Sequence, residues 1–116
     1  MIVKNVEDVE LEDVHMDGVE GAKIQWLASK KDGAPNFAMR RFKVTPGGRI
    51  DLHDHGWEHE IYILSGNGEA FTRDERKSIG PGDVLFIPGD EAHGYSNTGK
   101  EDLVFICMIP NSGDLR

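Results

Sequence analysis

The sequence has one cysteine, Cys107, among its 116 residues. An internal disulfide is therefore excluded, and no apolar leader of the secretory kind opens the chain, so we expect a cytoplasmic protein. Long apolar runs are also missing. The longest, LVFICMIP at 103–110, is far shorter than the roughly 20 residues that a membrane-spanning helix needs. We therefore expect no membrane partner.

Positive charge is in short supply as well. Lysine and arginine number 13 against 21 acidic residues, which gives a net charge of −8. The basic residues come at most in adjacent pairs such as Lys30–Lys31 and Arg40–Arg41. A surface of this charge repels DNA, RNA and anionic lipid, so we expect no nucleic-acid partner. The length suits one domain, which we expect to cover 1–116.

Helical periodicity is sparse. Residues 6–20 mix periods of two and three, so we expect 1–22 to form an irregular acidic arm with at most one helical turn. From residue 23 onward, short segments rich in β-branched and aromatic residues alternate with turns that contain Gly and Pro. The segments are 23–29, 37–44, 60–65, 83–89 and 102–109, and the turns are TPGG (45–48), SGNG (65–68), GPGD (80–83), PGDE (88–91) and NTGK (97–100). This pattern predicts an all-β sandwich or barrel over 23–110.

The run at 103–110 is apolar at both parities, unlike a strand with one face in water. A strand of this kind is buried on both faces. One face is expected to point into the barrel, and the other needs a cover, either from the N-terminal arm or from a second subunit. We therefore expect a homodimer.

Three of the five histidines, His53, His55 and His59, fall within seven residues. On a strand His53 and His55 share a face, and a strand that resumes after a corner at 56–58 puts His59 inward and Glu60 outward. A bulge at Gly56 would reverse that parity, so alternation alone leaves His59 and Glu60 both open as the third ligand. Clustered imidazoles indicate a site for Zn, Mn, Fe, Ni or Cu.

A fourth candidate ligand is His93, in PGDEAHGY on what we expect to be another strand. His15 has no other histidine near it in the sequence, and we expect it to be solvated in the acidic arm.

These residues resemble the two motifs of the cupin family. Five residues lie between Gly47 and His53-x-His55, and five lie between Gly82 and Pro88. His93 then follows, and Asn97 comes after three more residues. The resemblance implies a cupin double-stranded β-helix, or jelly-roll barrel. The departure at Asp90, where the family has Gly, is tolerable because Asp adopts the left-handed conformation more readily than most residues.

The count to the closing glycine of the first motif selects the third ligand. Six residues separate His59 from Gly66, as the motif requires, whereas five separate Glu60 from Gly66. The chain therefore resembles the small single-domain cupins with a four-histidine metal site, formed here by His53, His55, His59 and His93.

Four neutral ligands would leave a divalent ion its full charge and make it a strong Lewis acid. We expect one such ion, with Mn or Fe favoured and Zn, Ni or Cu also consistent with imidazole donors. The expected function is a metal-dependent oxidoreductase of dioxygenase type that acts on a small anionic or aromatic molecule. The alternatives are a non-catalytic metal- and ligand-binding cupin, or a sugar-phosphate isomerase or epimerase.

Five further residues are expected to line the substrate pocket: Arg40, Tyr95, Phe105, Cys107 and Ile109. Either Arg40 or Arg41 must point inward, and the resemblance favours Arg40, where it would pair with an anionic substrate. Tyr95 shares a face with His93. Cys107 is interpreted as a buried, inert side chain, with a reactive thiol or an extra ligand as the alternative.

Overall fold

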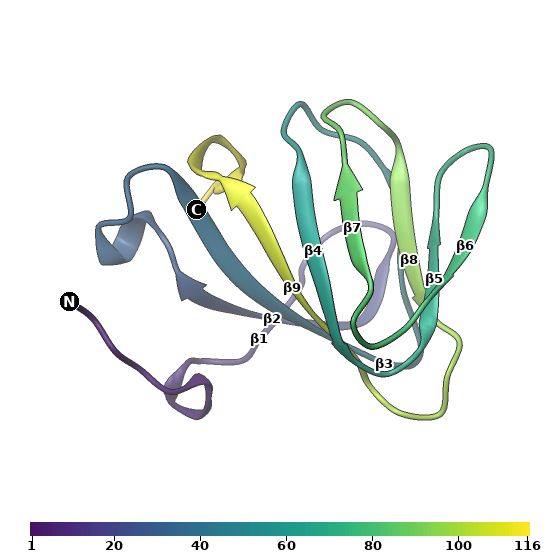
Figure 1. Ribbon diagram of the computed structural model, residues 1–116, viewed down its shortest axis with the longest axis horizontal. Helices are drawn as coiled ribbons and strands as arrows, with labels where there is room; N and C mark the ends of the chain where they lie inside the picture. Colours follow the sequence, from purple (N-terminus) through teal and green to yellow (C-terminus); the bar gives the residue numbers. More distant parts are fainter.

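A computed structural model describes all residues from 1 to 116 as one nine-stranded sheet with three short 3₁₀ helices (Figure 1). The strands are β1 (Glu12–Asp13), β2 (Val19–Ala28), β3 (Phe37–His53), β4 (His59–Ser65), β5 (Gly68–Phe71), β6 (Arg76–Ile79), β7 (Val84–Ile87), β8 (His93–Asn97) and β9 (Leu103–Pro110). The 3₁₀ helices are η1 (Val6–Asp8), η2 (Lys30–Asp32) and η3 (Asn111–Gly113). No helix is long and apolar enough to cross a membrane.

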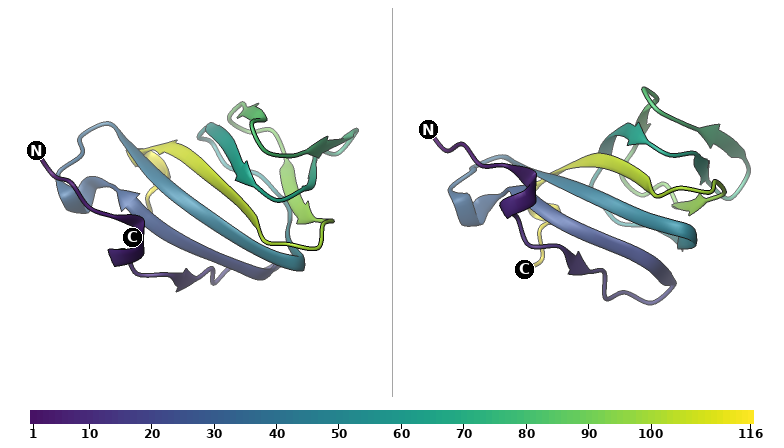
Figure 2. Two further views of the ribbon diagram at one scale, coloured as in Figure 1. Left: turned by 60° about the horizontal axis from the view of Figure 1, so that its bottom comes forward. Right: turned by 90° about the horizontal axis from the view of Figure 1, so that it is seen from below.

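The sheet runs in the order β6-β5-β8-β3-β9-β4-β7, with β2 on β3 and β1 on β2, and every pairing is antiparallel. The long strand β3 belongs to two walls, because residues 37–44 pair with β9 whereas residues 49–53 pair with β8. The sheet therefore curls on itself (Figure 2), and its strands form the predicted jelly roll.

The core lies between these two walls. It holds 15 buried residues, among which Ile61, Ile63 and Phe105 are at most 2% exposed. Strand β4 shows the expected alternation, because His59, Ile61 and Ile63 are buried while the residues between them are exposed. The prediction that His59 points inward and Glu60 outward is confirmed.

Two details differ from the expected elements. TPGG at 45–48 is not a turn between strands but a bulge inside β3. Ala22 of β2 pairs with Val44, whereas Glu20 pairs with Arg49, so the residues between Val44 and Arg49 are extra in β3. Gly47, with φ +80°, absorbs the extra length. Because β3 continues past this bulge, β2 can begin at Val19 rather than at residue 23, and the arm is shorter than expected.

The first part of the arm, residues 6–9, packs on the outer face of β2. The Gln25 side chain donates to the carbonyl oxygens of Val6 and Val9, at 3.0 Å each. These two hydrogen bonds hold the η1 segment over Gln25. The single helical turn expected in the arm is η1.

Candidate metal centre and ligand cavity

Four histidines converge at one end of the barrel. One ring nitrogen from each of His53, His55, His59 and His93 lies within 4.8 Å of the other three. His53 ends β3 and is directly opposite His93, which begins β8, and His59 begins β4. The fold therefore brings together histidines from three separate segments of the chain.

His55 reaches the cluster from a loop, not from a strand as expected. Its ring stacks on Trp57, with centroids 4.2 Å apart and planes 4° apart. Its carbonyl oxygen accepts a 2.8 Å hydrogen bond from the Asp90 amide, which ties the loop to the β7–β8 turn. Asp90 is the one non-glycine residue with positive φ, +67°, as its tolerance of that conformation predicts.

Three of the rings are oriented by backbone carbonyls. Nδ1 of His53, His55 and His93 lies 2.8, 2.8 and 2.7 Å from the carbonyl oxygens of residues 51, 57 and 91. A carbonyl oxygen only accepts, so each Nδ1 carries the proton and each Nε2 is left with a free lone pair. This is the arrangement in which histidine binds a metal through Nε2.

The Nε2 atoms find no partner outside the cluster itself. The Nε2 atoms of His55 and His59 are 2.8 Å apart, and Nε2 of His93 is buried without any hydrogen bond. At 2.8 Å the His55 and His59 nitrogens are within hydrogen-bond distance of each other, and a cation held between the four rings would take up the lone pair of every Nε2 at once. The donor set therefore fits a divalent metal ion.

His59 differs from the other three because no carbonyl holds its Nδ1. Instead, the Cys107 sulfur lies 3.1 Å from that nitrogen and the Arg40 guanidinium 3.5 Å from it. Arg40 also donates to the same sulfur at 3.0 Å. Cys107 thus links the histidine cluster to the one arginine that β3 turns inward.

Burial keeps three of the four imidazoles uncharged. It lowers the pKa of His59 to about 2, helped by the positive charge of Arg40, and it lowers the pKa of His93 to about 4. Burial also lowers the pKa of His55. The three imidazoles are therefore neutral near pH 7, which is the form that ligates metals.

A cavity of about 560 Å³ opens beside the cluster. His53, His55 and His59 line it, together with the predicted pocket residues Arg40, Tyr95, Phe105 and Cys107. The fifth predicted pocket residue, Ile109, is buried in the core and does not line the cavity. The reason is that Ile109 pairs with Ala38 at the far end of β9, beyond the inward-facing Arg40.

Two polar groups in this cavity lack partners. The Tyr95 hydroxyl and Nε of Arg40 are both buried without a hydrogen bond. Burial raises the pKa of Tyr95, so the phenol stays a neutral donor at pH 7. Burial also raises the pKa of the Cys107 thiol, which favours the inert interpretation of that side chain.

Part of this lining could not be predicted from the sequence. Residues 12–16 of the arm, including the exposed His15, border the cavity, as do Leu115 and Arg116 at the other terminus. The Arg116 guanidinium lies 3.7 Å from the Trp26 ring centroid and pairs with Asp114. These residues have no motif spacing, and only the folding of both termini across β2 brings them here.

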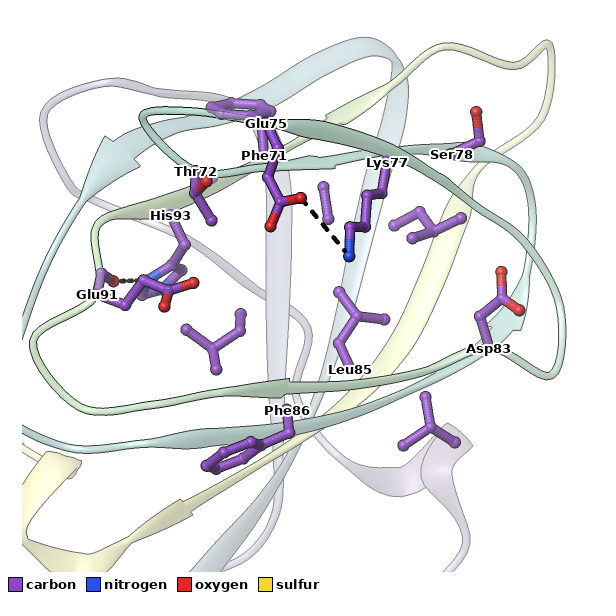
Figure 3. A pocket seen from close by; sticks show the side chains of 15 residues that line it. Phe71, Thr72, Glu75, Lys77, Ser78, Asp83, Leu85, Phe86, Glu91 and His93 are labelled. Atoms are coloured by element: carbon purple, nitrogen blue, oxygen red, sulfur yellow. Dashed lines mark hydrogen bonds and ion pairs between the residues drawn. The ribbon is translucent and has the colours of Figure 1, made fainter.

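A second cavity, of about 390 Å³, lies where the sheet fails to close between β6 and β7 (Figure 3). His93 lines this cavity, whereas the other three histidines line the first one. Lys77 and Glu75 form an ion pair of 3.7 Å at its rim. The histidine cluster therefore stands between two cavities.

Residues 40–109 match the family described as the cupin domain. The chain belongs to the cupin family. It is 34% identical to the oxalate-binding protein of Thermotoga maritima, over 94% of this chain and 93% of that protein. It is also 30% identical to L-ectoine synthase of Bordetella petrii, over 94% of this chain and 81% of that enzyme.

Solved cupin structures superimpose closely on this one. The polyketide cyclase RemF from Streptomyces resistomycificus matches with a TM-score of 0.91 and 33% identity, over 96% of this chain and 80% of that one. A predicted oxalate decarboxylase from Thermotoga maritima matches with a TM-score of 0.84 and 31% identity, over 94% of this cupin and 98% of its own chain. Proteins with such different named activities share the fold, so membership alone does not identify a reaction.

Proposed function

We propose that this cupin binds one divalent metal ion through His53, His55, His59 and His93, and acts on a small anionic organic molecule in the adjoining cavity. The observation that carries the proposal is the convergence of four ring nitrogens within 4.8 Å of one another, with Nε2 of His93 buried and unpartnered. Mn or Fe is the ion favoured from the sequence, and imidazole donors also suit Zn, Ni and Cu.

The cavity supplies the groups that would hold the ligand. Arg40 offers a partly buried guanidinium with an unused Nε, and Tyr95 offers a neutral hydroxyl without a partner. Together they suit a carboxylate or enolate oxygen. Phe42, Phe105 and Trp26 form apolar walls that exclude water and suit a flat, conjugated body.

When bound, a divalent ion held by four neutral imidazoles would polarise an oxygen atom of the ligand. The names of two relatives agree with an oxygen-rich anionic ligand, since one is an oxalate-binding protein and another a polyketide cyclase. The chain's own contribution is to orient that ligand through Arg40 and Tyr95 and to shield it from water.

Two kinds of reaction fit this site. The dioxygenase-type oxidation expected from the sequence requires a redox-active metal. Similarity to a polyketide cyclase at a TM-score of 0.91 favours non-oxidative activation of a carbonyl compound as the second candidate. A sugar-phosphate isomerase is less well supported, because no lysine lines the cavity and its second arginine, Arg116, is already paired with Asp114.

Elemental analysis of protein purified without a tag or chelator separates the two reactions. One equivalent of Mn or Fe, with oxygen uptake in the presence of aromatic and dicarbonyl acids, supports oxidation. One equivalent of Zn, without oxygen uptake, supports the non-oxidative candidate. Absence of metal binding, even after incubation with each of these ions, contradicts the whole proposal.

Ligand binding is tested with oxalate as the probe, measured calorimetrically on metal-loaded protein. Replacing Arg40 with Ala should weaken binding by roughly 10- to 100-fold, since a hydrogen bond to a charged group contributes about 1.5–3 kcal/mol. Arg41→Ala is the matched control, because Arg41 lies on the opposite face of β3 and donates to Gln25. Equal affinity in both variants, at equal metal content, would show that Arg40 does not bind the anion.

The homodimer and the cytoplasmic location expected from the sequence belong to the same proposal. The negative net charge agrees with a protein that works on small molecules rather than on nucleic acid.

A further inference from the structure

A short C-terminal segment borders the first cavity, which lies beside the histidine cluster. This segment, the C-terminal strap, covers residues 111–116: it begins with η3 after β9 and ends beside β2 (Figure 2). Gly113, Leu115 and Arg116 line the cavity, as do three of the four clustered histidines. The strap therefore shares the cavity with the cluster, although none of its residues belongs to the cluster.

Hydrogen bonds tie the strap to the residues that follow β2. The Asp114 side chain is buried, and its carboxylate accepts from Nε and from a terminal nitrogen of Arg116, at 3.0 Å each. Arg116 also donates to the Ser29 hydroxyl at 2.9 Å, and the Lys30 ammonium donates to the carbonyl oxygen of Asp114 at 2.6 Å. Loss of the Asp114 carboxylate would leave the Arg116 guanidinium without its anion and release the strap.

The strap contacts both tryptophans of the chain. The Arg116 guanidinium lies 3.7 Å from the centroid of the Trp26 ring, which is a stacking distance. Gly113 lies directly against Trp57, because a Cβ added at Gly113 would be 2.9 Å from both Cδ1 and Nε1 of that indole. Only a residue without a side chain allows so close an approach. The strap is therefore held against the cavity wall at two aromatic rings.

Trp57 connects the strap to one of the clustered histidines. Its indole stacks on the His55 ring, with centroids 4.2 Å apart and planes 4° apart. Nδ1 of His55 also donates to the Trp57 carbonyl oxygen at 2.8 Å. His55 stands on a loop, so no neighbouring strand fixes it. Since the stacking and the hydrogen bond both come from Trp57, displacement of Trp57 would change the direction of the lone pair on Nε2 of His55.

We propose that Gly113 and Asp114 are positioning residues for the metal centre: the strap holds Trp57 against His55 and thereby fixes that imidazole for the ion. This role rests on the proposed metal binding. A strap that served only the stability of the barrel would need the ion pair of Asp114 with Arg116. It would not need a glycine pressed against the ring that orients a clustered histidine.

Gly113→Ala tests the positioning directly, with Co(II) as the metal probe. The added methyl group should push the Trp57 indole away from its place on His55. The visible absorption bands of bound cobalt should then shift, and its dissociation constant should rise ~10-fold, the lower end of the effect of groups that support metal ligands. Gly80→Ala is the matched control, because a Cβ there would also lie 2.9 Å from a side-chain atom, Oδ1 of Asn67, outside the cavity.

Tryptophan fluorescence of the metal-free chain tests the strap without relying on an ion. Asp114→Ala should free the strap from both indoles, so the emission should shift to the red and acrylamide should quench it more strongly than in the parent. Gly113→Ala should give the same change in part, from Trp57 alone. Asp102→Ala is the control, because Asp102 forms an ion pair with Lys43 at 3.4 Å and does not line the cavity. Circular dichroism of every variant should equal that of the parent.

The outcomes separate the strap from the metal site. Parental cobalt bands and affinity in Gly113→Ala, or parental quenching in Asp114→Ala, would overturn the positioning role and leave the proposed metal binding intact. A parent chain that binds no cobalt would contradict the proposed metal binding, and the positioning role would fail with it.

Discussion

At the level of single residues, the choice between His59 and Glu60 decides the charge of the proposed metal centre. The two are adjacent, but the pleat of β4 buries His59 and leaves Glu60 exposed. A glutamate ligand would reduce the charge at the metal by one, so its exclusion makes the proposed ion a stronger Lewis acid.

This assignment makes a prediction about metal content. His59→Ala should weaken metal affinity more than ~100-fold. Loss of a residue that only hydrogen-bonds to a metal ligand already lowers the affinity 10- to 100-fold. Glu60→Gln should retain one equivalent, since its side chain points to solvent. Elemental analysis after dialysis gives the readout. Metal retained in His59→Ala but lost in Glu60→Gln would reverse the assignment.

The lowered pKa values of the buried histidines predict how stability depends on pH. In the metal-free folded chain the pKa of His59 is about 2 and that of His93 about 4, whereas the ordinary value is 6.5. Below about pH 6.5 the unfolded chain binds protons that the folded chain does not, so stability falls as pH falls. The loss of stability caused by His93 is complete near pH 4, whereas the loss caused by His59 continues toward pH 2.

Between its folded and its unfolded pKa, each of these histidines should lower the free energy of unfolding by about 1.4 kcal/mol for each unit that the pH falls. Urea unfolding of chelator-treated protein between about pH 7 and about pH 4.5 measures this slope. His15→Gln should leave the slope unchanged, because His15 is exposed and stands outside the cluster. A stability that is flat across that range would contradict the burial of neutral imidazoles.

At the level of elements, two glycines with nearly the same φ have different reasons to be glycine. Gly47 has φ +80° in the β3 bulge, and an added Cβ there would meet open space. Gly66 has φ +82° in the β4–β5 turn, and an added Cβ would press on the backbone of Asp102 and lie 2.8 Å from the Cα of Leu103. The first position carries only backbone strain, and the second adds a clash with the chain that leads into β9.

We therefore expect Gly47→Ala to cost about 1 kcal/mol and Gly66→Ala at least about 3 kcal/mol in the free energy of unfolding. Urea denaturation of both variants gives the comparison. Equal losses would mean that the β4–β5 turn can move away from β9, and that its close approach is not required for the fold.

The elements also show the limit of local patterns. The hairpin of β5 and β6 was not expected, because RDERK (73–77) is too polar to resemble a strand. It forms because Glu69 and Ala70 pair with Ser96 and Tyr95 of β8, which are far away in the sequence. Strand propensity of this kind depends on neighbours more than on composition.

At the level of the whole molecule, the histidine cluster joins segments that would otherwise meet only through the sheet. His53 to His59 arrive with β3 and β4, and His93 arrives with β8 from the other wall. A metal ion bound here would bind the folded chain and not the unfolded one, so binding must stabilise the fold.

Metal loading should therefore raise the melting temperature. An ion at 100 times its dissociation constant contributes about 2.7 kcal/mol, which corresponds to a rise of roughly 10 °C for a chain of this size. Calorimetry of chelated and reloaded protein measures the rise, and the same ions added to His93→Ala should give little or none. An equal rise in both proteins would place the stabilising ion elsewhere.

The sequence determined the all-β class, most turns, the inward parity of β4 and the identity of the clustered histidines. These depend on local rules: alternation along a strand, glycine at positive φ, and motif spacing. Tertiary structure decided that His55 sits on a loop stacked against Trp57, that Ile109 lies beyond the cavity, and that the two termini border it. Those outcomes depend on contacts between residues distant in the chain, and a local pattern carries no information about such contacts.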